Sequence, residues 1–237
     1  MIKVDLLDTM GSDLSVVNAA RVSFNKESTW EFDWYPEYNS DYEVWLSDRD
    51  TKLIQYLAKH DHWSPFAHCF LSFRIKAPIF VARQLAKHQV GLSWNEVSRR
   101  YVDDEPEFYV PEKWRKRADN VKQGSSDEAV SDVFRVRFGG DVTVSDAYAN
   151  YMAYAEDLYK EMLEHGVAPE QARMVLPQST MTEWIWSGSL MAFIRVCKLR
   201  LDPHTQQETR EVAALIADYL EQSFPVSYNA LMDTSHG

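Results

Sequence analysis

The fold is decided by the stretch Val81–Tyr101, which reads VARQLAKHQVGLSWNEVSRRY. A helix with Pro78 at its first position, continuing to about His88, would carry one contiguous polar face, because residues three and four apart lie side by side on a helix. After Gly91 the pattern changes to period two, which predicts an extended strand whose alternate side chains share one side. The side chains on the shared side of this strand are Trp94, Glu96, Ser98 and Arg100.

The helix and the strand together predict a site for a phosphorylated ligand. The polar helical face consists of Arg83, Gln84, Lys87 and His88. The strand adds a carboxylate, a hydroxyl and a guanidinium. A guanidinium binds phosphate as a planar fork, and the amide, hydroxyl and carboxylate groups can bind the polar edges of a ring. We therefore expect the ligand to combine a phosphate with a hydrogen-bonding ring.

Local charge supports an anion site in a chain that is acidic as a whole. The chain has 25 Lys+Arg against 36 Asp+Glu, a net charge of −11. From Pro65 to Val102, however, six residues are basic and only Glu96 is acidic. Such a local excess attracts anions; the alternative interpretation is a solvated basic face. The negative total argues against a nucleic-acid partner, because affinity for phosphate backbones depends on a broad basic surface.

Length and composition predict one soluble domain over residues 1–237. A chain of 237 residues can bury one sizeable core, and 45% hydrophobic with 26% charged residues is typical of globular proteins. Cys69 and Cys197 are the only cysteines, so neither a disulfide framework nor zinc-type spacing is present. The sequence shows no signal peptide and no membrane-spanning run, so we expect a cytoplasmic protein without a membrane partner.

Periodicity predicts an α+β fold in which helices surround a small, mostly antiparallel sheet. The expected strands are Ile2–Leu7, Cys69–Lys76 and Thr182–Trp186. The expected helices are Asp13–Arg21, one capped by Ser47, Ser145–His165 ending at Gly166, a short one after Pro169, Leu190–Leu199, and a final helix capped by Asp202 with Pro203 at its first position. We expect an irregular loop over Phe24–Tyr42 and a polar surface insertion over about 103–140.

Three histidines near an aspartate invite a metal interpretation. They are His60, His62 and His68, and the aspartate is Asp61. No H-E-x-x-H or comparable ligand spacing accompanies them, so solvated or packed histidines are favoured and no metal is predicted. A metal-dependent hydrolase using this group remains an alternative.

The central stretch resembles the signature of the flavin-dependent thymidylate synthases, which methylate dUMP without a cysteine nucleophile. The family motif is a basic-His-basic triplet followed by N-E-x-S-x-R-Y. Here the triplet is Lys87-His88-Gln89, and the second part is Asn95–Tyr101. Two departures stand out: Gln89 replaces a basic residue, and eight residues rather than seven separate the triplet from Ser98.

Three further segments extend the resemblance over most of the chain. His62–His68 resembles the family's H-x-T-P-F-E-H, with Ser64 at the flavin-contacting threonine and Ala67 in place of the glutamate. Arg173 precedes a hydrophobic-proline turn, as does an arginine that contacts dUMP in the family. Leu199–His204 resembles the family's L-R-x-D-x-H element. Between these last two segments, Ser189 and Arg195 stand where flavin-contacting asparagines are usual.

The resemblance implies reductive methylation of dUMP to dTMP by a homotetramer whose sites are shared between subunits. Methylenetetrahydrofolate would donate the carbon, reduced FAD the hydride, and NADPH would be the reductant. Arg200 would be catalytic, stabilising negative charge that develops on the uracil. The implied dUMP residues are Gln84, Lys87, Glu96, Ser98, Arg99, Arg100, Arg173 and Arg200. The implied FAD residues are Ser64, Lys87, His88, Gln89, Glu96, Ser189, Arg195 and His204. A regulatory protein that binds the nucleotide but has lost flavin, through Ala67, Gln89, Ser189 and Arg195, is a second alternative.

Overall fold

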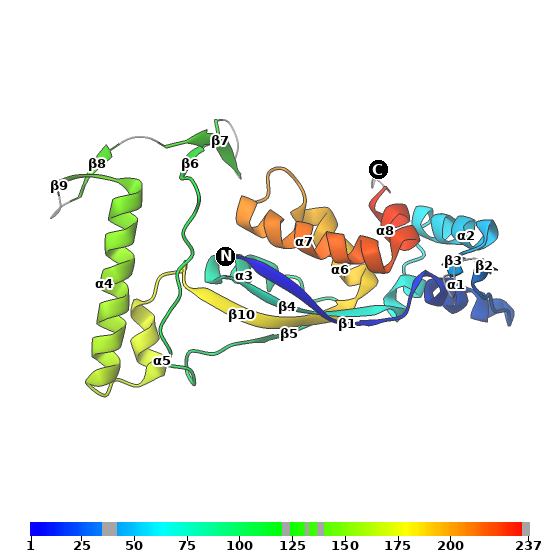
Figure 1. The fold of residues 1–237 in the computed structure, drawn as a ribbon, viewed down its shortest axis with the longest axis horizontal. Helices are drawn as coiled ribbons and strands as arrows, with labels where there is room; N and C mark the ends of the chain where they lie inside the picture. The colour runs from blue at the N-terminus through cyan, green and yellow to red at the C-terminus, as the bar shows by residue number, and fades with distance from the viewer. Residues whose placement is uncertain (35–41, 120–123, 131–132, 137–139, 234–237) are drawn as a thin grey trace.

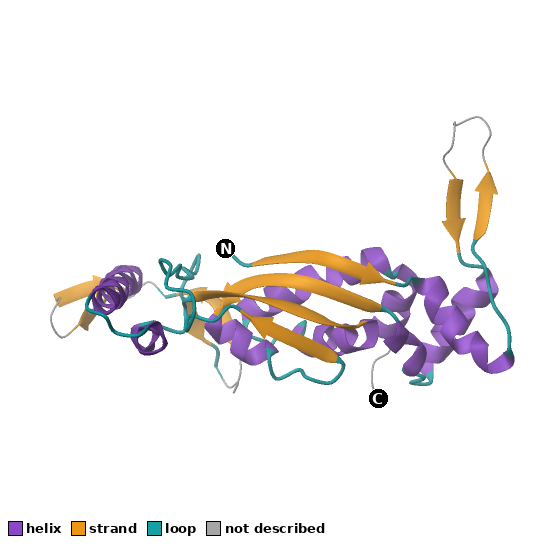
Figure 2. Cartoon of the chain, turned by 90° about the horizontal axis from the view of Figure 1, so that it is seen from below, coloured by secondary structure: helices purple, strands orange, loops and turns teal. Residues whose placement is uncertain are grey.

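The computed structural model describes residues 1–34, 42–119, 124–130, 133–136 and 140–233. At its centre lies a four-stranded antiparallel sheet in the order β1-β4-β10-β5. The strands are β1 (Lys3–Met10), β4 (Phe70–Pro78), β10 (Met181–Ser189) and β5 (Leu92–Glu96). Helices cover one face of this sheet, and within the described ranges no helix covers the other (Figures 1 and 2). The predicted α+β class with a small antiparallel sheet is confirmed.

The core lies between the sheet and the helices of its covered face. These are α3 (Ile79–Leu85), α6 (Leu190–Arg200), α7 (Gln207–Ser223) and α8 (Pro225–Met232). Alternate residues of β4 and β10, among them Phe73 and Trp186, are fully buried because successive side chains of a strand point to opposite faces. Phe193 of α6 meets both rings edge-on, at 5.0 Å and 5.4 Å. Burying a large apolar side chain stabilises the fold by about 1.5–3 kcal/mol.

One end of the sheet carries a smaller helical layer. It contains α1 (Asp13–Arg21), η1 (Val22–Phe24), α2 (Asp48–Lys59) and η3 (Ser64–His68). Asp50 joins α2 to α1, because its carboxylate pairs with Arg21 and also accepts a hydrogen bond from Ser28. The side chain of Ser47 accepts from the backbone N–H of Asp50, so the predicted cap of α2 is confirmed. No helix in the described ranges is both long enough and apolar enough to cross a membrane.

The irregular loop predicted over Phe24–Tyr42 is partly wrong. The structure has an antiparallel hairpin of β2 (Glu31–Trp34) and β3 (Tyr42–Trp45), in which Phe32 pairs with Val44. The period-two alternation of acidic and aromatic residues in β2 carried the signal, but its partner strand follows only after residues 35–41, which lie outside the described ranges.

A second group of elements stands apart from the sheet (Figure 1). It comprises α4 (Val144–Glu164), α5 (Pro169–Ala172), η4 (Arg173–Val175) and two hairpins, β6 (Arg115–Arg117) with β7 (Ser125–Ala129) and β8 (Val133–Val136) with β9 (Gly140–Thr143). Gly166 has φ +80, as the predicted residue after the end of α4 requires.

The region expected as a surface insertion is tied to the body by several contacts, of which two are the most informative. The backbone N–H of Tyr109 donates to Ser179 O at 2.8 Å, next to the start of β10. Further along, Arg115 Nη2 donates to Glu208 Oε1 of α7 at 2.7 Å, and the side chains of this ion pair are 14% and 5% exposed. The segment is therefore anchored by a largely buried charge pair.

The final helix predicted to begin at Asp202 and Pro203 begins later. The structure starts α7 at Gln207, and α8 follows as a separate helix. Asp202 Oδ1 accepts from the backbone N–H of His204 at 2.7 Å. This contact across two residues closes an Asx-type turn, so Asp202 begins a turn rather than the helix.

Candidate functional site

Three of the predicted site residues meet between α3 and α6. Arg200, the last residue of α6, donates from Nε to His88 Nε2 at 3.0 Å and from Nη2 to Gln84 O at 3.4 Å. Gln84 lies in α3, and its side-chain amide donates to Gln206 in the loop before α7. We call Gln84, His88 and Arg200 the Arg200 cluster. It joins residues that are more than 110 positions apart in the chain.

The helix that begins this cluster is shorter than predicted. Because α3 ends at Leu85, Lys87 and His88 lie in the following turn, which the backbone N–H of His88 closes on Leu85 O at 2.9 Å. The turn places the half-buried His88 ring near the buried Trp186, with ring centroids 6.5 Å apart. Lys87 and Gln89 on either side are exposed.

The electrostatics of the cluster favour a neutral His88 beside a charged Arg200. Burial and the nearby Arg200 charge lower the pKa of His88 below its ordinary value. Burial also lowers the pKa of Arg200, but a guanidinium remains charged in proteins. Arg200 has five N–H donors, of which the two contacts use one each, so three remain for a ligand.

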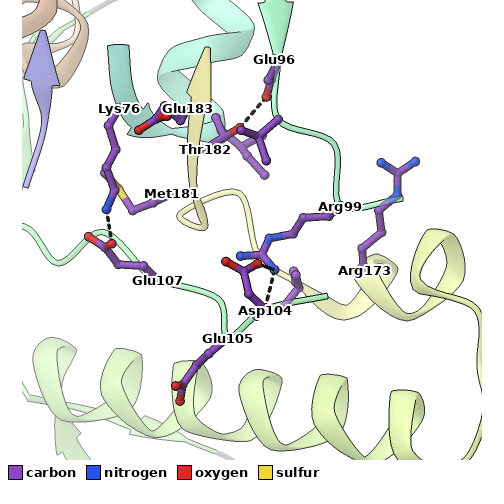
Figure 3. A pocket seen from close by; sticks show the side chains of 13 residues that line it. Lys76, Glu96, Arg99, Asp104, Glu105, Glu107, Arg173, Met181, Thr182 and Glu183 are labelled. Atoms are coloured by element: carbon purple, nitrogen blue, oxygen red, sulfur yellow. Dashed lines mark hydrogen bonds and ion pairs between the residues drawn. The ribbon is translucent and has the colours of Figure 1, made fainter. Parts of the chain in front are cut away.

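Three other predicted residues line a cavity of about 360 Å³ beside the start of β10. They are Glu96, Arg99 and Arg173, and we call this cavity the Arg173 pocket. Figure 3 shows Glu96 at the end of β5, Arg99 in the following loop and Arg173 in η4. Gln84, His88 and Arg200 do not line it.

Glu96 is held in place by one residue of the neighbouring strand β10 and by one of its own strand. Its Oε1 accepts from Thr182 Oγ1 at 2.8 Å (Figure 3). Its Oε2 accepts from Trp94 Nε1 at 3.2 Å. Both contacts orient an exposed carboxylate. Thr182 could not be predicted as a partner of Glu96, because it lies 86 positions further along the chain.

The strand that was predicted to reach Arg100 ends at Glu96. After the last ladder pair, between Glu96 and Trp184, Ser98 to Tyr101 forms a turn, which the backbone N–H of Tyr101 closes on Ser98 O at 2.9 Å. The Ser98 hydroxyl accepts from Arg100 Nε at 3.1 Å. Ser98 and Arg100 are therefore close, but a turn rather than strand alternation brings them together.

Acids from elsewhere in the chain neutralise part of the basic stretch. Arg74 pairs with Glu183 at 3.2 Å, Lys76 pairs with Glu107, and Arg99 Nη1 lies 3.5 Å from Asp104 Oδ1. Among the described residues, no carboxylate pairs with the other three bases, which are Arg83, Lys87 and Arg100. The unpaired basic surface that can attract anions is therefore smaller than the sequence predicted.

Ser64 lines a larger cavity, of about 1,100 Å³, at the other end of the sheet. Its walls carry the basic side chains of Arg21, Lys26, Arg49 and Lys52 and the aromatic rings of Phe24, Tyr56 and Trp63. Arg195 of α6 lies nearby, with its guanidinium carbon 6.0 Å from the centre of the Trp63 ring. We call this cavity the basic-aromatic pocket. Basic groups and rings in this combination suit a large ligand that carries phosphates and aromatic rings.

The remaining predicted flavin residues do not line this pocket. Ser189 is buried, and its hydroxyl caps α6 by accepting from Ala192 N at 3.2 Å. His204 is exposed in the turn before α7, where its Nδ1 lies 3.0 Å from Asp202 Oδ1. The hydrogen bond from Ala192 N gives Ser189 a structural role as the N-cap of α6.

The histidine group at the end of α2 does not assemble a metal site. The His60 ring packs on Tyr56 at 4.3 Å, and the His60 and His62 ring centroids are 6.4 Å apart. No group of three or more His, Cys, Asp or Glu residues within the described ranges is placed to hold a metal ion.

Comparisons with known proteins identify the family. A family model described as thymidylate synthase complementing protein matches residues 5–226. A flavin-dependent thymidylate synthase of Kosmotoga olearia is 36% identical over 237 residues, which covers 98% of this chain and 91% of that protein. One from Thermus thermophilus is 37% identical over 232 residues, covering 96% of this chain and 74% of that protein.

Solved structures agree with this result. The crystal structure of the UMP/dUMP methylase PolB from Streptomyces cacaoi, bound with 5-Br dUMP, superimposes with a TM-score of 0.75 at 30% identity. The match covers 97% of this chain and 94% of that one. These likenesses support neither the metal-dependent hydrolase nor the regulatory protein considered as alternatives. By sequence over nearly its whole length, the chain belongs to the flavin-dependent thymidylate synthase family.

Proposed function

We propose that this protein methylates dUMP reductively to dTMP, with methylenetetrahydrofolate as carbon donor, FAD as cofactor and NADPH as reductant. The observation that carries the proposal is the Arg200 cluster. It presents a half-buried guanidinium, fixed along one edge and open along the other, at the position that the family resemblance gives to the catalytic arginine.

The open edge of Arg200 suits the charge that develops during the reaction. The uracil ring must become electron-rich at C5 before it can attack the one-carbon unit, and the enolate-like form that does so carries negative charge along its N3–O4 edge. A cation that is already fixed at that edge stabilises the transition state more than the ground state, and this difference accelerates the reaction. Gln84 and His88 contribute by holding the guanidinium before the substrate arrives.

The Arg173 pocket and the turn beside it suit the phosphate and the sugar of dUMP. Arg173 is exposed, with Nε donating to Glu170 O at 3.2 Å, and its remaining donors are available to a phosphate. Ser98, Arg99 and Arg100 lie on the adjoining turn. Glu96, held by Thr182, would accept hydrogen bonds at the border between nucleotide and flavin.

The separation of these groups supports a site shared between subunits. The Arg200 cluster and the Arg173 pocket have no lining residue in common, although residues from both are expected to bind one nucleotide. In a homotetramer, the Arg200 cluster of one subunit would complete the Arg173 pocket of another. The sheet face that carries no helix leaves a broad surface available for such an assembly (Figure 2).

FAD fits the chemistry of the basic-aromatic pocket. Lys26, Arg49 and Lys52 would bind its pyrophosphate, Trp63 and Tyr56 offer faces to its rings, and Ser64 is a hydrogen-bonding group on the same wall. When bound and reduced by NADPH, FAD would supply the hydride that completes the methyl group. Lys87, His88, Gln89 and His204 lie outside this pocket and would reach the cofactor from another subunit.

The proposal is tested with purified protein supplied with FAD, NADPH, methylenetetrahydrofolate and dUMP. An oxidised-flavin spectrum should appear on adding FAD, NADPH should bleach it, and dTMP should accumulate only when all four are present. A folded protein that binds FAD and is reduced by NADPH, yet forms no dTMP, would refute the proposed reaction.

A further inference from the structure

His88 touches Arg200 in a way that fixes the protonation of its ring. Because Arg200 Nε is a donor, His88 Nε2 must accept, which it can do only when it carries no proton. The ring is therefore neutral, with its proton on Nδ1. Trp186 packs near the His88 ring, and the turn after α3 fixes the backbone of His88. The acceptor atom Nε2 is therefore held in one orientation toward Arg200.

We propose that His88 is the positioning residue of Arg200, whose guanidinium it orients toward the nucleotide by accepting the Nε hydrogen bond. The inference rests on the proposed function, because it assigns a role within the same reaction. His88 acts through Arg200 and needs no contact of its own with the nucleotide.

The contact with Arg200 limits what His88 can offer to a flavin. The family resemblance implies that His88 contacts flavin, but Nε2 is already engaged by Arg200, so only Nδ1–H and the ring face remain for such a contact. Without His88, Arg200 would lose the shorter of its two hydrogen bonds. The remaining one, to Gln84 O, is 3.4 Å long. A guanidinium held by one long contact would sample several orientations.

The contact makes the cluster sensitive to acid. Protonation of Nε2 would replace an acceptor by a donor and place two cations side by side, which would break the contact. Two groups among the described residues face the His88 ring. Arg200 of α6 is charged, and Trp186 of β10 is neutral. Both burial and Arg200 lower the pKa of His88, so the contact persists until the pH falls below the ordinary histidine range, about 6.5.

Two substitutions at this position separate positioning from packing. His88→Gln places an amide oxygen where it can still accept from Arg200 and has no titratable group. His88→Leu fills similar space without an acceptor. We expect His88→Leu to lower kcat by roughly ten- to a hundredfold, the range for a hydrogen bond to a charged group, with KM for dUMP less affected. His88→Gln should retain most of the kcat and lose the acidic limb of the pH profile. His165→Gln, at an exposed histidine of the α4 end, is the matched control.

A measurement on the unreacted protein tests the contact without turnover. In ¹⁵N-histidine spectra, His88 is identified by the signal that disappears in His88→Gln, and it should show the neutral tautomer protonated at Nδ1. Arg200→Ala should raise the pKa of His88, because a neighbouring cation is removed, whereas Arg195→Ala on the same helix should leave it unchanged.

These outcomes separate the failure of the inference from that of the proposed function. A wild-type protein that forms no dTMP but shows the expected His88 tautomer and pKa response would refute the reaction alone. A pKa of His88 that does not respond to Arg200→Ala, a His88→Leu enzyme with wild-type kcat, or an unchanged acidic limb in His88→Gln would each overturn the positioning role.

Discussion

The Arg200 cluster and the Arg173 pocket differ in how firmly the chain itself holds the arginine of each. Arg200 is half-buried and fixed by two contacts from α3 and the turn after it. Arg173 is exposed on the short 3-10 turn η4, and its side chain is held by a hydrogen bond from Nε to Glu170 O at 3.2 Å. A fixed group can stabilise a transition state without reorganising, whereas an exposed group mainly contributes to binding. The comparison therefore predicts a catalytic task for the first and a binding task for the second.

Replacing Arg200 by alanine should have the largest effect. Loss of one preorganised donor typically lowers the rate by about 10²–10³-fold. We expect Arg200→Ala to fold, bind FAD and lose dUMP-dependent turnover by a factor of this order. Arg200→Lys should restore little, because a point charge cannot reproduce two contacts along one planar edge. Single-turnover oxidation of the reduced enzyme by dUMP and methylenetetrahydrofolate measures the effect.

Arg210→Ala serves as the control for this experiment. Arg210 lies one turn into α7, and its side chain donates to Pro203 O at 2.9 Å rather than to a residue of the Arg200 cluster. It should turn over like the unmodified enzyme. If Arg200→Ala also did so, Arg200 would be no more than a structural contact between α6 and α3.

Replacing Arg173 should weaken binding more than chemistry. A charge-assisted hydrogen bond contributes about 1.5–3 kcal/mol, so Arg173→Ala should raise the Kd for dUMP by roughly 10–150-fold. The turnover at saturating dUMP should change much less. Calorimetric titration with dUMP and with deoxyuridine separates the phosphate from the ring: the substitution should hardly alter the weaker binding of deoxyuridine. Equal losses for both ligands would show that Arg173 does not bind the phosphate.

Mixing two inactive variants tests whether the two regions meet across subunits. Arg200→Ala and Arg173→Glu destroy different halves of the proposed site. Co-expressed in equal amounts, they should assemble at random, so about one site in four would combine an intact Arg200 with an intact Arg173. Activity well above that of either parent is expected at low dUMP. A mixture that remains as inactive as its parents, with mixed oligomers demonstrated by two affinity tags, would place both residues in one subunit's site.

The same contrast shows what could be predicted from the sequence. Helices with a strong apolar stripe were predicted well: α1 matches Asp13–Arg21, and α4 lies within one residue of Ser145–His165 at each end. The contact between His88 and Arg200 could not be predicted, because nothing local in either segment indicates a partner 112 positions away. Its geometry follows from the fold, which brings the last residue of α6 to the end of α3 and the turn after it.

Two local errors have identifiable physical causes. Ser98 fits a strand by its period, but its hydroxyl accepts from Arg100 and stabilises a turn instead. Asp202 before Pro203 is equally compatible with a helix start and with a turn, and its contact to His204 N selects the turn. In both cases a side chain competes with regular secondary structure for the backbone.

The smallest effect is expected from the cysteines, which lie in neither region. Cys69 and Cys197 are buried, and burial raises their pKa to about 11 and about 12. At neutral pH both thiols are therefore protonated, whereas a nucleophile needs the thiolate. Each thiol donates to a carbonyl, Cys69 to Ser12 O at 3.6 Å and Cys197 to Ala213 O at 3.8 Å, so a serine hydroxyl would find a partner. The double variant Cys69→Ser, Cys197→Ser should keep its kcat and lose some thermal stability, because a hydroxyl is more costly to bury than a thiol. The contrary outcome is a loss of dTMP formation while the Tm, FAD binding and dUMP binding stay near those of the unmodified protein. A thiol would then be part of the chemistry. The contrast between a catalytic Arg200 and a binding Arg173 would in that case omit the nucleophile.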